Sequence, residues 1–148
     1  MLKSLFAVAL LAVVRPVAGQ TGCALPVVKV LRNNQEVPRS GAPLAPKVTL
    51  QVDPAPECPR SSSYRFTDAE LTLVRGRRPL VPSIHANGPD VDLSAWMKLV
   101  QPGDRIYVFV PYKSLVVVAA DGTPQPFPQP KLEADSQNGI GFNWALVP

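Results

Sequence analysis

The chain has 148 residues, with 15 basic and 11 acidic side chains and a formal net charge of +4. This modest charge does not require a polyanionic partner. Its 18 prolines exclude long helices, because proline lacks the backbone N–H and fixes φ, while 46% hydrophobic residues suffice for one domain of ordinary size with a core.

The first residues have the pattern of an export signal. Lys3 precedes an apolar run from Leu5 to Val14, and the small residues of Val17–Gly19 predict cleavage before Gln20. The run is too short to span a bilayer, which needs about 20 residues. We therefore expect residues 1–19 to be a signal peptide and the mature protein to be periplasmic or secreted, with no membrane span.

Signal cleavage would change both the charge and the chemistry at the new N-terminus. It removes Lys3 and Arg15, so the formal charge falls to 13 − 11 = +2. A lipid anchor on Cys23 is not expected, because Gln20 occupies the position where a lipoprotein signal needs an apolar residue.

The two cysteines, Cys23 and Cys58, are expected to form one disulfide. Two cysteines in a small exported domain meet an oxidising compartment. The loop-entropy picture gives such a bridge a stabilisation of roughly 3 kcal/mol. Free thiols are the alternative. Neither a CxxC motif nor a Cys/His cluster is present, so no zinc or other metal site and no cofactor is predicted.

The N-terminal half of the mature chain predicts strands separated by proline-rich loops. Residues 20–46 are interpreted as an extended N-terminal segment, with a strand at 27–33 and a loop at 38–46. The alternation in "KVTLQVD", 47–53, predicts a half-buried strand, followed by a loop over 54–63. A second alternating strand is predicted through Val74, with a bend at Gly76 and a short extension toward Val81.

One short helix and up to four further strands complete the prediction, which brings the total to six or seven short strands. Ser83 to Gly88 is a candidate strand, and Leu93, Trp96, Met97 and Val100 have helical spacing over about two turns. "RIYVFVPY" predicts a central buried strand, and 115–120 and 142–147 predict two more; Gly139 to Gly141 is interpreted as a turn. The expected fold is mainly β: a small immunoglobulin-like β-sandwich or related β-domain over 47–148, with one short helix.

Catalytic residues are not predicted. His85 is the only histidine, so a Ser-His-Asp arrangement would have to combine it with Ser83, Ser94 or Ser114, and no GxSxG elbow surrounds any serine. The close acidic pairs Asp68/Glu70 and Asp90/Asp92 are typical of a solvated strand edge and a helix start. A small hydrolase using His85 is the least favoured function.

Three arginines cluster in "LVRGRRPL". Arg75, Arg77 and Arg78 are candidates for binding an acidic protein or a surface polysaccharide, although a solvated bend in a strand would also explain them. Nucleic acid is not expected, because no aromatic side chain for base stacking lies nearby in sequence and the chain is predicted to be exported.

The order of motifs over Tyr64 to Thr123 resembles a known family. "FTDAELTLVRGRRPL", a "NGP" turn, "VDLSAWMKLVQPGD", "RIYVFVPY" and "VVAADGT" are similar to the C-terminal domain of GldM, a periplasmic component of the gliding-motility and type IX secretion machinery. The resemblance implies that Gly76, Gly103 and Asp104 lie at turns and brings no catalytic residues. Unlike the long, membrane-anchored GldM proteins, this chain is expected to carry a signal peptide and one domain.

These observations favour a non-enzymatic exported β-domain that binds an envelope or secretion-apparatus protein. The alternative is a secreted carbohydrate-binding module. That function requires exposed aromatic side chains on one sheet face, for which Tyr107, Phe109, Tyr112 and Trp144 are the candidates.

Overall fold

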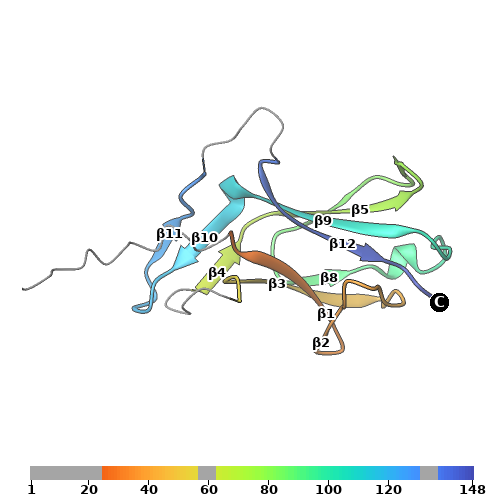
Figure 1. Cartoon of the computed structure of the whole chain (residues 1–148), viewed down its shortest axis with the longest axis horizontal. Coiled ribbons are helices and arrows are strands. Elements are labelled where there is room, and N and C mark those ends of the chain that lie inside the picture. The colour runs from red at the N-terminus through yellow and green to blue at the C-terminus, as the bar shows by residue number, and fades with distance from the viewer. Residues whose placement is uncertain (1–24, 57–62, 131–136) are drawn as a thin grey trace, which may run out of the picture.

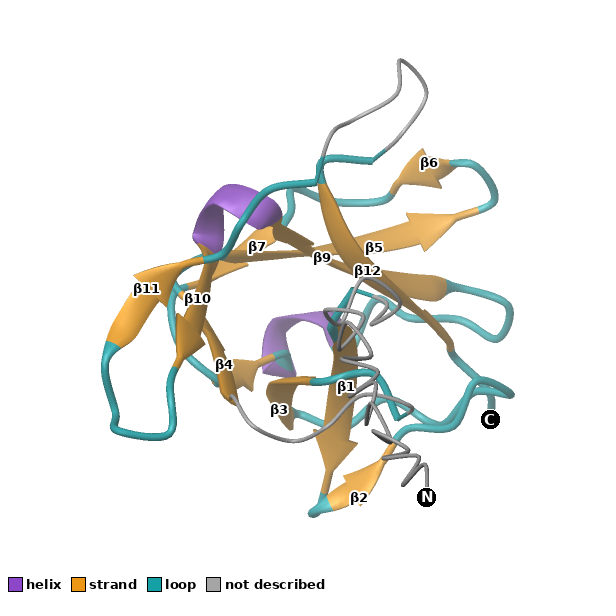
Figure 2. Ribbon diagram, turned by 60° about the vertical axis from the view of Figure 1, so that its left-hand side comes forward, coloured by secondary structure: helices purple, strands orange, loops and turns teal. Residues whose placement is uncertain are grey.

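Strands make up most of the folded chain. The computed structural model describes residues 25–56, 63–130 and 137–148. Strands account for 51% of the structure and helices for 5%, and no helix in the described part reaches seven residues. The predicted mainly-β class is therefore confirmed, in the form of a small β-sandwich built from antiparallel sheets (Figures 1 and 2).

The two sheets that enclose the core are named after their strands β1 and β9. The β1 sheet has the order β2-β1-β3-β8 and consists of β2 (Gln35–Glu36), β1 (Val27–Arg32), β3 (Lys47–Asp53) and β8 (Asp90–Asp92). The β9 sheet has the order β12-β9-β5-β6, with β7 also paired to β5, and consists of β12 (Gly139–Ala145), β9 (Arg105–Pro111), β5 (Ala69–Arg75), β6 (Arg78–Pro79) and β7 (Ile84–Ala86).

A smaller third sheet extends one end of the molecule. It has the order β11-β10-β4 and consists of β11 (Pro124–Pro126), β10 (Leu115–Val118) and β4 (Ser63–Phe66). Two 3₁₀ turns complete the described structure, η1 (Ser94–Trp96) and η2 (Tyr112–Ser114). The described residues contain twelve strand segments rather than the six or seven predicted, because several pairings last only two or three residues.

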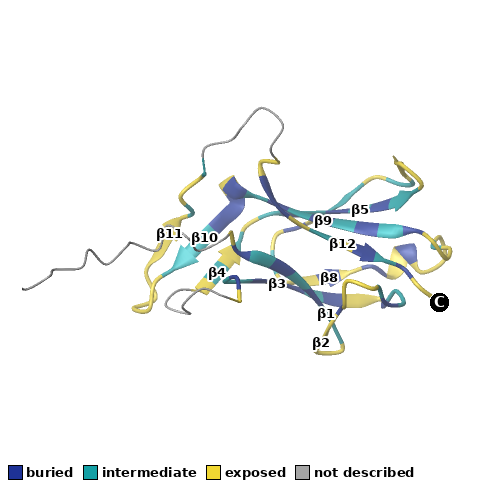
Figure 3. Ribbon diagram, viewed as in Figure 1, coloured by how far each residue is buried: buried dark blue, intermediate teal, exposed yellow. Residues whose placement is uncertain are grey.

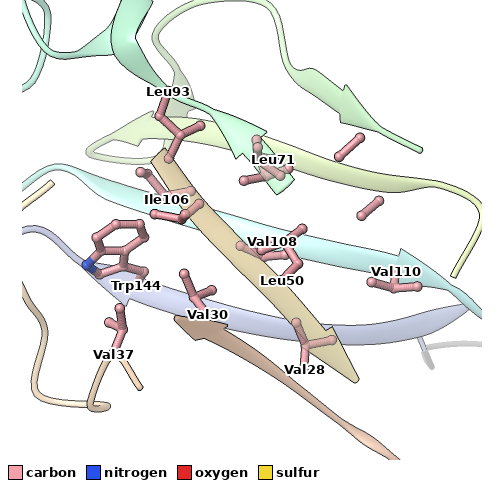
Figure 4. Close-up of a cluster of buried hydrophobic side chains, with 14 of the residues drawn as sticks. Val28, Val30, Val37, Leu50, Leu71, Leu93, Ile106, Val108, Val110 and Trp144 are labelled. Atoms are coloured by element: carbon pink, nitrogen blue, oxygen red, sulfur yellow. The ribbon is translucent and has the colours of Figure 1, made fainter. Parts of the chain in front are cut away.

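The core lies between the β1 and β9 sheets, as Figures 3 and 4 show. Every second residue of β3 and of β9 is buried, which is the period-two pattern expected of half-buried strands. The inward side chains of β9, Ile106, Val108 and Val110, are fully buried. Each such burial stabilises the fold by about 1.5–3 kcal/mol relative to exposure. The predicted central strand at 105–111 is therefore confirmed.

The stretch interpreted as an extended N-terminal segment, 20–46, contributes a strand to this sandwich. Its residues Val27 to Leu31 pair antiparallel with β3, and Val28 and Val30 lie in the core. The register places the buried Val28 and Val30 opposite the buried Val52 and Leu50 of β3, so that the inward side chains of the two strands pack together.

The predicted two-turn helix is wrong and is replaced by the three-residue η1 turn. Leu93 and Trp96 are buried as predicted, but Met97 remains 43% exposed. The Asp92 carboxylate accepts the N–H of Ser94 at 2.9 Å, a local side-chain bond that favours a turn at this point over a continuous helix. A segment with only two buried apolar positions gains too little packing to propagate a helix.

The predicted turn at Gly139 to Gly141 is also wrong, because these residues begin strand β12. Gly139 pairs with Pro111 and Gly141 with Phe109. A Cβ atom built on Gly139 would lie 2.7 Å from the Phe109 ring, and one on Gly141 would lie 2.5 Å from the Tyr107 hydroxyl. Because glycine has no side chain, these two positions leave room for the rings of Phe109 and Tyr107, which belong to the adjacent strand β9 and lie over β12.

Candidate binding surface at the β5–β6 hairpin

The three arginines predicted to bind a partner lie on a tight hairpin. Strand β5 ends at Arg75, and the chain reverses so that Arg75 pairs with Arg78. Gly76 has φ = +65°, and a left-handed glycine at the first of two turn positions is typical of type II′ hairpins. The predicted bend at Gly76 is confirmed, and the short extension predicted after it is strand β6, which folds back along β5 and pairs with it.

Arg75 makes a bidentate ion pair with Asp104. Its Nε donates to Asp104 Oδ1 at 2.9 Å and its Nη2 donates to Asp104 Oδ2 at 2.9 Å. Nη2 also donates to the Leu99 carbonyl at 3.0 Å, and Asp104 accepts the N–H of Gln101 at 2.8 Å. The paired bonds give this contact both strength and a fixed geometry.

Burial and charge make Asp104 the more constrained partner of the pair. Its side chain is 3% exposed, whereas that of Arg75 is 39% exposed. The hydrogen bond from Arg75 holds the pKa of Asp104 below its ordinary value, although desolvation opposes this shift. Arg75, one of the three candidate partner-binding residues, therefore ties β5 to the turn before β9.

A second arginine supports the hairpin from the neighbouring strand. Arg105 Nη2 donates to the carbonyl of Gly76 at 3.0 Å. Arg77 and Arg78, by contrast, are exposed and take part in no ion pair among the described residues. We call these two residues the basic tip. Two arginines thus hold the hairpin in place, and two present charge to solvent.

The η1 turn and the C-terminus lie at the same end of the molecule as the hairpin that follows β5 (Figures 1 and 3), and exposed apolar side chains occur in these segments. Met97, Leu99 and Val147 are 43%, 41% and 39% exposed. A hollow of about 140 Å³ is lined by Leu44, Val100, Gln101, Pro102, Leu146, Val147 and Pro148. The sequence predicted a buried helical face for Met97, so this apolar surface was not anticipated.

The histidine and the serines are only partly brought together. His85 Nδ1 lies 3.2 Å from Asp68 Oδ1, and Glu70 lies directly across the strand pair from His85. Ser83 Oγ, however, lies 2.8 Å from the Thr72 hydroxyl, and its only side-chain hydrogen bond in the described structure is this one.

The two remaining serine candidates lie on other elements. Ser94 is bonded to Asp92, and Ser114 is buried in η2. In the described part of the chain, therefore, no serine–histidine hydrogen bond completes a relay. No group of three potential metal ligands occurs in that part either.

Two of the four candidate aromatic side chains remain accessible. Trp144 and Tyr112 are buried, whereas Tyr107 and Phe109 lie half-buried on the outer face of the β9 sheet. Their ring centroids are 6.3 Å apart with an interplanar angle of 18°. A depression of about 330 Å³ next to them is lined by Thr72, Val74, Arg105, Tyr107 and Asn143.

Several predicted features fall outside the described residues. Cys23 and Cys58, the predicted disulfide partners, and the predicted signal peptide at 1–19 all lie there. Within the described ranges, no helix has the length and hydropathy needed to cross a bilayer.

Comparisons with known proteins give no relative from which the role of these residues could be inferred. No protein-family model, no curated protein and no solved structure matches the chain.

Proposed function

We propose that this chain is an exported, non-enzymatic β-sandwich domain that binds a protein partner in the bacterial cell envelope through the basic tip. The observation that carries the proposal is the contrast among the clustered arginines. Arg75 and Arg105 hold the hairpin by side-chain bonds, while Arg77 and Arg78 stay exposed on it. A charged pair on an anchored hairpin binds with little loss of backbone entropy.

The surroundings of the basic tip suggest the chemistry of the partner. Its guanidinium groups recognise carboxylates with matched geometry, so an acidic protein surface is expected. The exposed Met97 and Leu99 at the same end would add apolar contact. The resemblance of residues 64–123 to the C-terminal domain of GldM supports an envelope or secretion-apparatus protein as the partner.

Charge reversal of the basic tip tests this function. We expect the double variant Arg77→Glu/Arg78→Glu to lose at least about tenfold in partner recovery from solubilised envelope fractions, because each reversed charge repels an acidic surface. Its thermal midpoint should stay unchanged, since both side chains are exposed. The measurement is quantitative mass spectrometry of the proteins that co-purify with each variant.

The matched control makes the same change of net charge elsewhere. Arg65→Glu/Lys113→Glu alters two exposed residues near β4 and η2, at the other end of the sandwich. This variant should retain the partner. Equal recovery with both double variants, or no enriched protein with the wild-type chain, would contradict the proposal.

A carbohydrate-binding function is the second candidate, because Tyr107 and Phe109 remain partly accessible. Parallel rings on a sheet face offer a flat apolar surface on which a sugar ring can pack, with Thr72 and Asn143 as polar neighbours. If this function holds, Tyr107→Ser should abolish retardation in polysaccharide affinity gels and Tyr107→Phe should preserve it. Equal migration of the wild-type chain in gels with and without envelope polysaccharide would eliminate this candidate.

A further inference from the structure

Among the described residues, strand β12 has an open backbone edge on the side away from β9. At one end of the ladder, Leu146 N–H donates to the Asp104 carbonyl at 3.0 Å. At the other end, Tyr112 N–H donates to the Asn138 carbonyl at 2.8 Å. In an antiparallel pair, every second residue turns both its N–H and its C=O toward the same neighbour. The even-numbered residues from 138 to 146 therefore face β9, and the odd-numbered residues face away.

A contact at the end of β12 agrees with this assignment. The Ala145 carbonyl accepts the N–H of Ala42 at 3.1 Å, on the side away from β9. Ala42 thus pairs with the last part of the edge as an isolated bridge. Gly139, Gly141 and Asn143 have no backbone partner on this side among the described residues.

The open edge borders a large groove between the two sheets. The groove has a volume of about 890 Å³ and runs between β1 and β12, lined on one side by Val27 and Val28 and on the other by Ile140 and Phe142. In β1, the Val37 N–H donates to the Val30 carbonyl at 2.8 Å, so Val30 turns its backbone groups away from β3. By the same alternation, the N–H and C=O of Val28, two residues earlier, also point away from β3. Within the part of the chain that the structure describes, two strand edges without backbone partners thus border one largely apolar groove.

The rim of the groove carries charged side chains of both signs. Lys29, Arg39 and Glu36 line it, and Asp53 lies beside Lys29, so the formal charges sum to +2 − 2 = 0. Lys29 lies 3.8 Å from Glu36 and 3.4 Å from Asp53, while Arg39 forms no ion pair in the described structure. An acidic side chain seated in the groove would therefore meet an available guanidinium.

Natural sheets usually protect such an edge with charged side chains or proline, and β12 has neither. Its sequence, GIGFNWA, contains no charged residue and no proline over Gly139–Ala145. We propose that the free edge of β12, from Gly139 to Asn143, binds an extended peptide segment of a partner protein. The segment adds to the β9 sheet as a further strand, with apolar side chains at alternate positions and an acidic residue near Arg39.

Arg39 favours this occupant over a second copy of the chain. Another molecule pairing through its own β12 would bring its own Arg39 to the groove, whereas an acidic peptide would neutralise that guanidinium. The β12 edge is separate from the basic tip. An experiment can therefore reject peptide binding at β12 without rejecting partner binding at the basic tip, and the reverse.

A proline at position 143 tests the edge selectively. The N–H of Asn143 points away from β9, so Asn143→Pro removes one edge donor and leaves the β9 ladder intact. The probe is a fluorescent seven-residue peptide of alternating valine and threonine with a central glutamate. In fluorescence anisotropy with the full-length chain, we expect about tenfold weaker binding to Asn143→Pro. The matched variant Asn143→Thr, which keeps the N–H, should bind like the wild type.

A second probe keeps the test valid if Asn143→Pro does not fold. The same peptide methylated at every backbone nitrogen keeps its side chains but loses its donors, and it should not bind the wild-type chain. The variant Arg77→Glu/Arg78→Glu should bind the unmodified peptide normally. Equal binding of the methylated and unmodified peptides would overturn the proposal. So would a wild-type dimer in sedimentation velocity that Asn143→Pro converts to monomer, because the occupant would then be a second copy.

Discussion

Replacing Trp144 with alanine is expected to lower the free energy of unfolding by about 4 kcal/mol. Trp144 is fully buried between the β1 and β9 sheets, where Val30, Val37 and Ile106 surround it in Figure 4. Alanine would leave a cavity that packed strands on both sides are unable to close. Since small domains are stable by only about 5–15 kcal/mol, this single change removes much of the stability. Urea denaturation followed by circular dichroism measures it.

The indole hydrogen bond contributes separately and can be isolated. Trp144 Nε1 donates to the Ala42 carbonyl at 3.0 Å and thereby ties β12 to the loop after β2. Trp144→Phe keeps most of the ring and loses this bond, so we expect a smaller loss of about 1–2 kcal/mol. The exposed control Val147→Ala should change stability by less than about 0.5 kcal/mol. A Trp144→Ala variant as stable as that control would contradict the described core.

Removing the Asp104 carboxylate is expected to cost about 2 kcal/mol. The change to alanine leaves the N–H of Gln101 and the guanidinium of Arg75 without their acceptor. Breaking a fully buried ion pair costs about 3–5 kcal/mol, and the loss here is smaller because Arg75 is partly exposed and can be hydrated. The measurement is again the free energy of unfolding in urea, with the exposed Asp90→Ala as the control.

The pH dependence of this loss identifies the ion pair as its cause. Because the folded-state pKa of Asp104 is lowered by Arg75, its stabilisation is present above the unfolded-state pKa, about 3.9, and is lost as pH falls toward the folded value. The difference in stability between wild type and Asp104→Ala should therefore be constant near neutrality and shrink below about pH 4. A difference that stays constant down to pH 2 would assign the loss to packing instead.

The strands were largely predictable from the sequence because their signal is local. In "KVTLQVD" and "RIYVFVPY" the alternation of side chains is itself the physical cause of a half-buried strand, and both strands occur where they were expected. The turn at Gly76 was also predictable, since few residues other than glycine enter the left-handed region. These features depend on residues within a few positions of one another.

The predictions of a two-turn helix after Asp92 and of a turn at Gly139 to Gly141 were wrong, because tertiary contacts determine the structure of both segments. Helical spacing at Leu93, Trp96 and Met97 does not show how much of each side chain a neighbouring sheet will cover, and Met97 was left exposed. Gly139 and Gly141 are weak strand formers by themselves. They belong to β12 because the rings of Phe109 and Tyr107 lie over them from the adjacent strand.

The sequence by itself determined that this chain folds mainly as β-structure and that three arginines cluster at a turn. Only the tertiary structure decided what each arginine does. Arg75 is held in an ion pair by Asp104, which lies 29 residues later in the chain, while Arg77 and Arg78 are exposed and form no ion pair among the described residues. Likewise, the open edge of β12 exists only in the assembled sheet. Local residue preferences fix strands and turns, but ion pairs and sheet edges depend on which distant segments the fold brings together.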